Sequence, residues 1–98
     1  METALPSTSQ PNNANETISS FFGTSLGQYY LTIKSGDLDF NGEGYVSIKG
    51  SDLSFFNDKM ESIYSIPVNT VISANTQGQN QDDITMTFEK EVYINAER

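Results

Sequence analysis

Apolar side chains recur at nearly every second position along most of this chain, from residue 28 to residue 94. Tyr29, Leu31 and Ile33 alternate with more polar residues, and the same spacing returns between Ile84 and Phe88. A period of two places alternate side chains on opposite faces of a β-strand. The runs are rich in β-branched and aromatic residues, which fit a pleated surface. The pattern therefore predicts a mainly β protein.

Turn-forming residues separate these runs. They are Ser35-Gly36-Asp37, Asn41-Gly42-Glu43-Gly44, Gly50-Ser51-Asp52, Asn57-Asp58-Lys59, the polar tract from Asn75 to Asp83, and Glu89-Lys90-Glu91. The segments between them predict about six or seven antiparallel strands in a small barrel or β-roll. Pro67 lies inside an apolar run and requires an edge position, a bulge or a strand break, because proline cannot donate to a β-ladder.

The alternation also predicts which side chains form the core. They are Leu31, Ile33, Val46, Ile48, Phe55, Ile66, Val71, Met86, Phe88 and Ile94. If the register of a strand were shifted by one residue, its predicted core side chains would face solvent. The burial of these residues therefore tests which face of each strand points inward.

The chain divides into a tail and one domain. Residues 1–16 carry little apolar mass and are predicted to be a disordered N-terminal tail. Residues 17–98 are predicted to form a single β domain. Within it, Ile18, Phe21 and Phe22 share one face at helical spacing and Gly23 follows them, which predicts at most one short helix.

Composition excludes several classes of function. The chain has no Cys and no His, which removes thiolate metal sites, a cysteine nucleophile and a Ser-His-Asp arrangement. We therefore expect no enzymatic activity and no cofactor. Thirteen acidic residues against five basic ones give a net charge of −8, which disfavours nucleic acid and anionic membranes as partners. The sequence lacks a signal peptide and a long apolar run, so we expect a cytoplasmic protein.

The segment from Asp39 to Ser47 resembles part of an EF-hand calcium loop. Asp39, Asn41 and Glu43 would supply oxygen ligands. Gly50 occupies the position where the loop needs a bidentate Glu, and strand-like runs flank the segment in place of helices. An acidic, glycine-rich hairpin turn is the favoured interpretation, and a calcium site stays as an alternative.

Two segments, Gly44 to Asp58 and Ser62 to Val68, followed by Val71-Ile72, are similar to bacterial PH-like or GRAM-like domains. Ile66-Pro67 before Val71-Ile72 is the most specific element. Within that group, the chain resembles the small regulators encoded beside mannose-type phosphotransferase operons, over about residues 26–96. The resemblance implies a PH-like small barrel.

The chain departs from that family in two places. Val68 stands where an aromatic residue is expected, and no C-terminal helix follows Arg98. The chain is then a shortened form, or the segment with Ile18, Phe21 and Phe22 plugs the barrel, or the fold is different. Phosphoinositide binding is not carried over, because it needs a basic pocket.

These observations favour a non-enzymatic regulatory module that recognises a protein partner. The expected partner-binding residues surround the proline in the irregular strand: Tyr64, Ile66, Pro67 and Val68. One alternative is an acidic inhibitor of the phage-encoded kind, which blocks a basic nucleic-acid enzyme by charge mimicry. A calcium-binding β domain is the second alternative, and an exposed edge strand also leaves a homodimer open.

Overall fold

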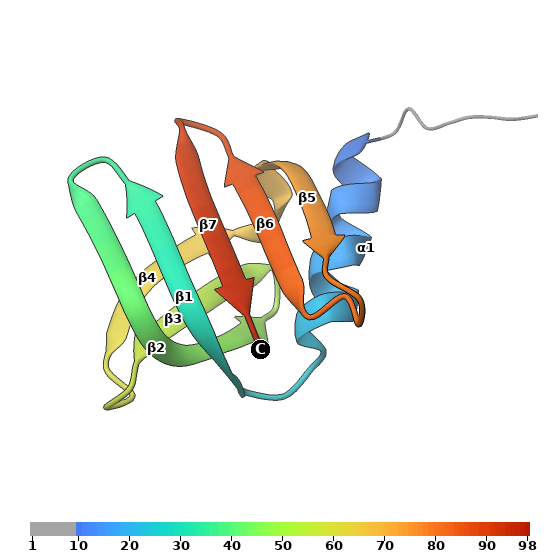
Figure 1. Cartoon of the computed structure of the whole chain (residues 1–98). Coiled ribbons are helices and arrows are strands. Elements are labelled where there is room, and N and C mark those ends of the chain that lie inside the picture. Colours follow the sequence, from blue (N-terminus) through green and yellow to red (C-terminus); the bar gives the residue numbers. More distant parts are fainter. Residues whose placement is uncertain (1–9) are drawn as a thin grey trace, which may run out of the picture.

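One antiparallel sheet of seven strands, one α-helix and one 3-10 turn make up residues 10–98, which the computed structural model describes, with side chains from Ala14 onward (Figure 1). The elements are α1 (Gln10–Phe22), β1 (Gly27–Ser35), β2 (Leu38–Lys49), β3 (Asp52–Asn57), β4 (Ser62–Pro67), η2 (Val68–Thr70), β5 (Val71–Gln77), β6 (Asp83–Phe88) and β7 (Val92–Glu97). The prediction of a mainly β fold with about six or seven antiparallel strands and one short helix is confirmed.

The sheet curls into a half-barrel, and β3 and β4 pass behind β1 and β7 in Figure 1. Its strand order is β4-β3-β2-β1-β7-β6-β5. Neighbours in this order are also neighbours in sequence except at β1 and β7, which pair between Tyr30–Glu97 and Lys34–Tyr93. As a result, the two edge strands, β4 and β5, are consecutive in the chain and only η2 separates them.

The core fills the inside of the curl. Every predicted core residue is buried except Ile48, which is half-buried and packs against the core from the end of β2. The largest fully buried side chains include Phe55 and Phe88. The structure adds buried residues that the sequence did not assign to the core: Ala14, Ile18, Phe21, Phe22, Tyr29, Leu53, Val68, Ile84, Val92 and Ala96.

Helix α1 begins at Gln10, so residues 10–16 are helical where the sequence predicts a tail. The remaining tail residues, 1–9, lie outside the described part of the chain. Thirteen residues of this composition are marginal as an isolated helix. The helix is held by its contacts, because Ile18 is 0% exposed and packs in the same cluster as the sheet.

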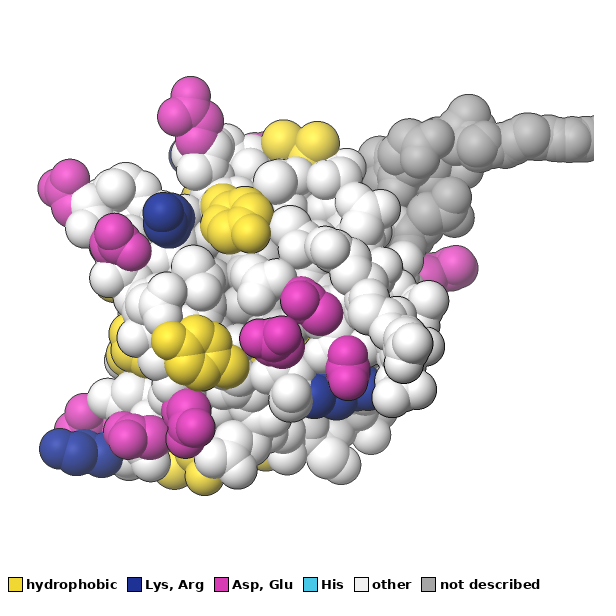
Figure 2. Space-filling model, viewed as in Figure 1, with side chains coloured by type: hydrophobic (Ala, Val, Ile, Leu, Met, Phe, Trp, Pro, Cys, Tyr) yellow, Lys and Arg dark blue, Asp and Glu magenta, His cyan; other side chains and the backbone are white. Residues whose placement is uncertain are grey.

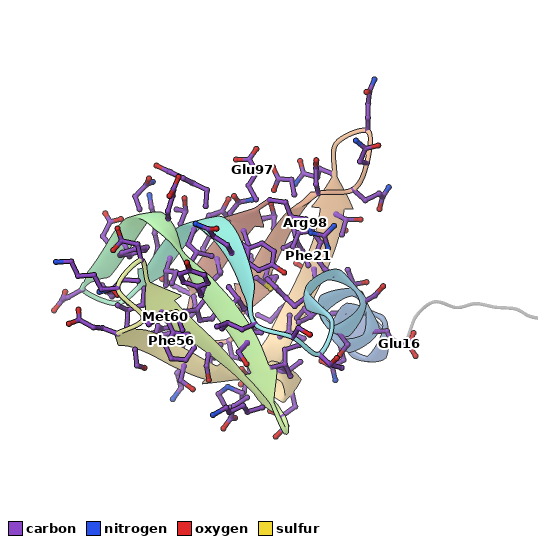
Figure 3. All side chains as sticks on the ribbon, turned by 90° about the horizontal axis from the view of Figure 1, so that it is seen from below. Glu16, Phe21, Phe56, Met60, Glu97 and Arg98 are labelled. Carbon is purple, nitrogen blue, oxygen red and sulfur yellow. The ribbon has the colours of Figure 1, made fainter. Side chains whose placement is uncertain are left out.

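The C-terminal end of α1 is fixed by aromatic and cationic contacts. The rings of Phe22 and Tyr29 meet edge to face at 5.1 Å between centroids. The Arg98 guanidinium lies 4.3 Å from the centroid of the Phe21 ring and also donates to the Phe21 carbonyl (Figure 3). Gly23, with φ of 70°, ends the helix as predicted. The segment with Ile18 and the two Phe residues thus belongs to the core cluster and packs mainly against β5.

The predicted turn at Asn41-Gly42-Glu43-Gly44 is wrong, because β2 continues through it from Leu38 to Lys49. The hairpin turns around β2 lie at Gly36 and Gly50, which both have positive φ. Gly44 has a different role. A Cβ atom at Gly44 would lie 2.2 Å from the Phe56 carbonyl oxygen, so glycine allows β3 to approach β2.

This close approach leads to a prediction. We expect Gly44→Ala to lower the free energy of unfolding by about 1–3 kcal/mol, because the backbone of β3 has to move. The matched control is Gly42→Ala in the same strand, where the nearest atom to the added Cβ is the Phe40 Cζ at 3.6 Å, an ordinary contact. Urea denaturation of both variants measures the difference. Equal effects at the two positions would contradict the packing role of Gly44.

Candidate functional site

A groove of about 540 Å3 lies where β4 passes the β1–β2 turn and the β6–β7 turn. It opens beside the edge strand β4, which supplies four of its lining residues. Its lining residues come from five parts of the chain: Ser35, Gly36, Tyr64, Ser65, Ile66, Pro67, Thr70, Glu89, Lys90 and Val92. The groove combines apolar side chains with hydroxyl groups and two charged residues.

The apolar part of the groove comes mainly from β4. Ile66 is 7% exposed, and the half-buried Tyr64 ring lies 6.2 Å from the ring of Phe55 on β3. The Tyr64 hydroxyl is hydrogen-bonded to Ser35 Oγ at 2.8 Å. This bond ties β4 to the end of β1 across the sheet and positions the Tyr64 ring.

Pro67 ends β4 and begins the 3-10 turn. The Thr70 hydroxyl donates to the Pro67 carbonyl oxygen at 2.8 Å. The Val68 N–H donates to the Ser51 carbonyl oxygen at 2.7 Å, and the Val68 side chain is buried. Pro67 therefore occupies an edge strand and also breaks the apolar run, and both are outcomes that the sequence allows for it.

The predicted partner-binding residues divide into two groups. Tyr64, Ile66 and Pro67 line the groove, whereas Val68 belongs to the core beneath it. Seven further lining residues were not predicted from the sequence as part of the site: Ser35, Gly36, Ser65, Thr70, Glu89, Lys90 and Val92. Turn-forming residues predicted the turns at Ser35-Gly36 and at Glu89-Lys90. Only the pairing of β1 with β7 brings these two turns together beside β4.

The β6–β7 turn on the groove wall has unusual backbone geometry. Lys90 and Glu91 have φ of 67° and 61°, a left-handed region that side chains other than Gly, Asn and Asp rarely adopt. The Glu89 N–H donates to the Thr70 carbonyl oxygen at 3.0 Å, which joins this turn to η2. Met60 and Gln81 also have positive φ in turns that do not line the groove, so this geometry at Lys90 and Glu91 reflects the tight hairpin turn between β6 and β7.

The residues of the calcium hypothesis lie on a strand. Asp39, Asn41 and Glu43 occupy alternate positions of β2 and are exposed. Asn41 accepts a hydrogen bond from the Tyr30 hydroxyl and donates to Thr32 Oγ1. Within residues 10–98, no three Asp, Glu, His or Cys side chains gather in a way that suits a metal ion. The loop that would wrap around calcium is therefore replaced by extended backbone.

The outer face of the sheet carries a polar ladder across five strands. Strand register places these residues in one row: Asn75, Thr85, Asn95, Thr32 and Asn41. The Asn95 amide donates to Asp83 Oδ1 at 2.7 Å and to Thr85 Oγ1 at 3.1 Å. Many of these groups already bond one another, so a ligand would have to displace existing hydrogen bonds.

Acidic side chains are spread over several parts of the surface (Figure 2). Asp39 and Glu43 lie on the outer face of β2, Glu97 lies at the end of β7, and Glu89 and Glu91 lie in the β6–β7 turn. Charge mimicry of a DNA groove needs acidic groups gathered on one face. Strand register places Glu43 and Glu97 on either side of Tyr30 on the outer face, with Asp83 beside Glu97, so part of the acidic charge is gathered there and charge mimicry stays an alternative.

No protein-family model, no curated protein and no solved structure matches this chain. No helix within residues 10–98 has the length and apolar character that crossing a membrane requires.

Proposed function

We propose that this protein is a binding module that recognises a protein partner through the groove beside β4. The observation that carries the proposal is the position of the groove, at an edge strand, with the Tyr64 ring and the Ile66 side chain in its lining. Protein interfaces are enriched in aromatic residues at their centres, surrounded by a polar rim. Here Tyr64 takes the central place, and Ser35, Thr70 and Lys90 supply the rim.

The proposal extends to a regulatory module of the PH-like kind. Its support is the resemblance of the segments from Gly44 to Asp58 and from Ser62 to Val68. The second segment contains β4, so the part of the chain that resembles the family also lines the groove.

The test compares two tyrosines on opposite faces of the sheet. Tyr64 lines the groove, and Tyr93 is 37% exposed on the outer face. A partner captured by the wild-type chain, identified by mass spectrometry and then purified, is titrated against Tyr64→Ala and Tyr93→Ala. We expect Tyr64→Ala to weaken binding by about 30-fold, as for a hot-spot residue, and Tyr93→Ala to leave it within about twofold.

Thermal unfolding of both variants verifies that they are folded at the titration temperature. Loss of binding by Tyr93→Ala with retention by Tyr64→Ala would refute the groove and assign recognition to the outer face.

A further inference from the structure

Strand β4 has a free backbone edge beside the groove. Within residues 10–98, β4 has a sheet neighbour on the β3 side only. The other edge strand, β5, is accompanied by α1, as Figure 1 shows. An edge strand presents unpaired N–H and C=O groups that can pair with another chain.

Strand register identifies the free groups. The Val68 N–H donates to the Ser51 carbonyl oxygen, and the same register pairs Ser54 with Ser65. Hydrogen-bonded and non-hydrogen-bonded pairs alternate in an antiparallel ladder, so Ser65 occupies a non-hydrogen-bonded position toward β3. The Ser65 N–H and C=O therefore point away from β3, toward the free side.

The free edge is short and is limited at both ends. Pro67 has no N–H, and its carbonyl oxygen already accepts from Thr70. The register shifts between Phe55 and Phe56, which marks a bulge near the start of β4. A proline and a β-bulge are both common in edge strands, where they limit pairing with other chains. They leave Ser65, which also lines the groove, as the central free position.

The charge around this edge favours a basic occupant. Five acidic residues lie near this edge: Asp52, which is in register with Pro67, Asp58 and Glu61 before β4, and Glu89 and Glu91 in the nearby turn. Three lysines lie near the same residues, Lys59, Lys90, and Lys49 in register with Asp52, so the surroundings of the edge keep a net negative charge. A second copy of the chain would bring a net charge of −8 against −8 and would be repelled at low salt. A segment carrying Lys or Arg would be attracted.

We propose that a basic, extended segment of the partner adds to β4 as a further strand, pairs with the backbone of Ser65 and places an apolar side chain in the groove. This inference rests on the proposed function and specifies its binding mode, in which main-chain hydrogen bonds supply affinity and a pocket supplies selectivity.

The test uses two variants of one residue. Ser65→Pro removes the free N–H without removing a donor to β3, and proline is tolerated at such a position of an edge strand. Ser65→Ala keeps the N–H. The probe is a capped peptide of about seven residues that alternates Lys and Val, titrated by calorimetry at low salt. We expect Ser65→Pro to weaken binding by about tenfold or more and Ser65→Ala by less than about twofold.

A second probe keeps the test valid if Ser65→Pro does not fold. The same peptide, N-methylated at alternate residues on one edge, keeps its charge and side chains but loses the donors for pairing. We expect it to bind the wild-type chain at least about tenfold more weakly than the unmethylated peptide. On binding of the unmethylated peptide, amide exchange at Ser65 should slow.

Three results would overturn strand addition. The first is equal binding of the methylated and unmethylated peptides, and the second is absence of binding of the Lys-Val peptide up to about 1 mM. The third is a wild-type dimer that Ser65→Pro dissociates, because a second copy of the chain would then be the occupant of the edge.

The captured partner distinguishes a failure of strand addition from a failure of the proposed function. If Tyr64→Ala loses that partner and Ser65→Pro keeps it, groove recognition stands and strand addition fails. If both variants keep it, both proposals fail.

Discussion

Replacing Phe88 by Ala is expected to lower the free energy of unfolding by about 3–5 kcal/mol. Phe88 lies at the end of β6, is 0% exposed, and is in register with Val71 on β5 and Val92 on β7. Truncation removes a large buried surface and leaves a cavity among three strands. Guanidinium denaturation followed by circular dichroism measures the change.

The control for Phe88→Ala is the truncation of an exposed apolar residue on β5, the strand that pairs with β6. Ile72 is 56% exposed in β5, and Ile72→Ala should change stability by less than about 0.5 kcal/mol. A loss below about 1 kcal/mol for Phe88→Ala would show that this side chain does not face the core.

Ile18→Ala is expected to cost about 2–5 kcal/mol and to release α1 from the sheet. Ile18 is 0% exposed and belongs to the core cluster that includes residues of β5 and β6. A helix of 13 residues has little stability of its own, so its packing decides whether it forms. The helical part of the far-UV spectrum should decrease together with the denaturation midpoint.

Ser19→Ala is the matched control, because Ser19 is exposed on the same helix. It should leave both the spectrum and the midpoint nearly unchanged. An equally small effect of Ile18→Ala would mean that the helix does not depend on this contact and that the sheet is stable without it.

Local patterns predicted much of the fold. The alternation identified the inward face of β1 at Leu31 and Ile33 and that of β6 at Met86 and Phe88, because side-chain direction in a strand depends only on position parity. The turns at Gly36 and Gly50 were also predicted, since positive φ is a local requirement that glycine satisfies at low cost.

Local patterns failed where a distant contact gives a residue its role. Gly44 resembles a turn glycine in sequence, but the Phe56 carbonyl on β3 is what requires it. Residues 10–16 are polar enough to be taken for a tail, and they become helical because the helix they begin buries Ile18 against the sheet. No periodicity in a short window reports such contacts.

The candidate site shows the same division. The sequence by itself determined most of the strands and their faces, although not the continuation of β2 from Asn41 through Gly44. It also determined the irregularity at Pro67, which lies close to Tyr64 and Ile66. Only the tertiary structure decided that β1 pairs with β7, that β4 lies at an edge of the described sheet, and that the turns at Gly36 and Lys90 lie beside it. The physical reason is that side-chain alternation is a property of neighbouring residues, whereas strand order depends on how the whole sheet buries its inner face.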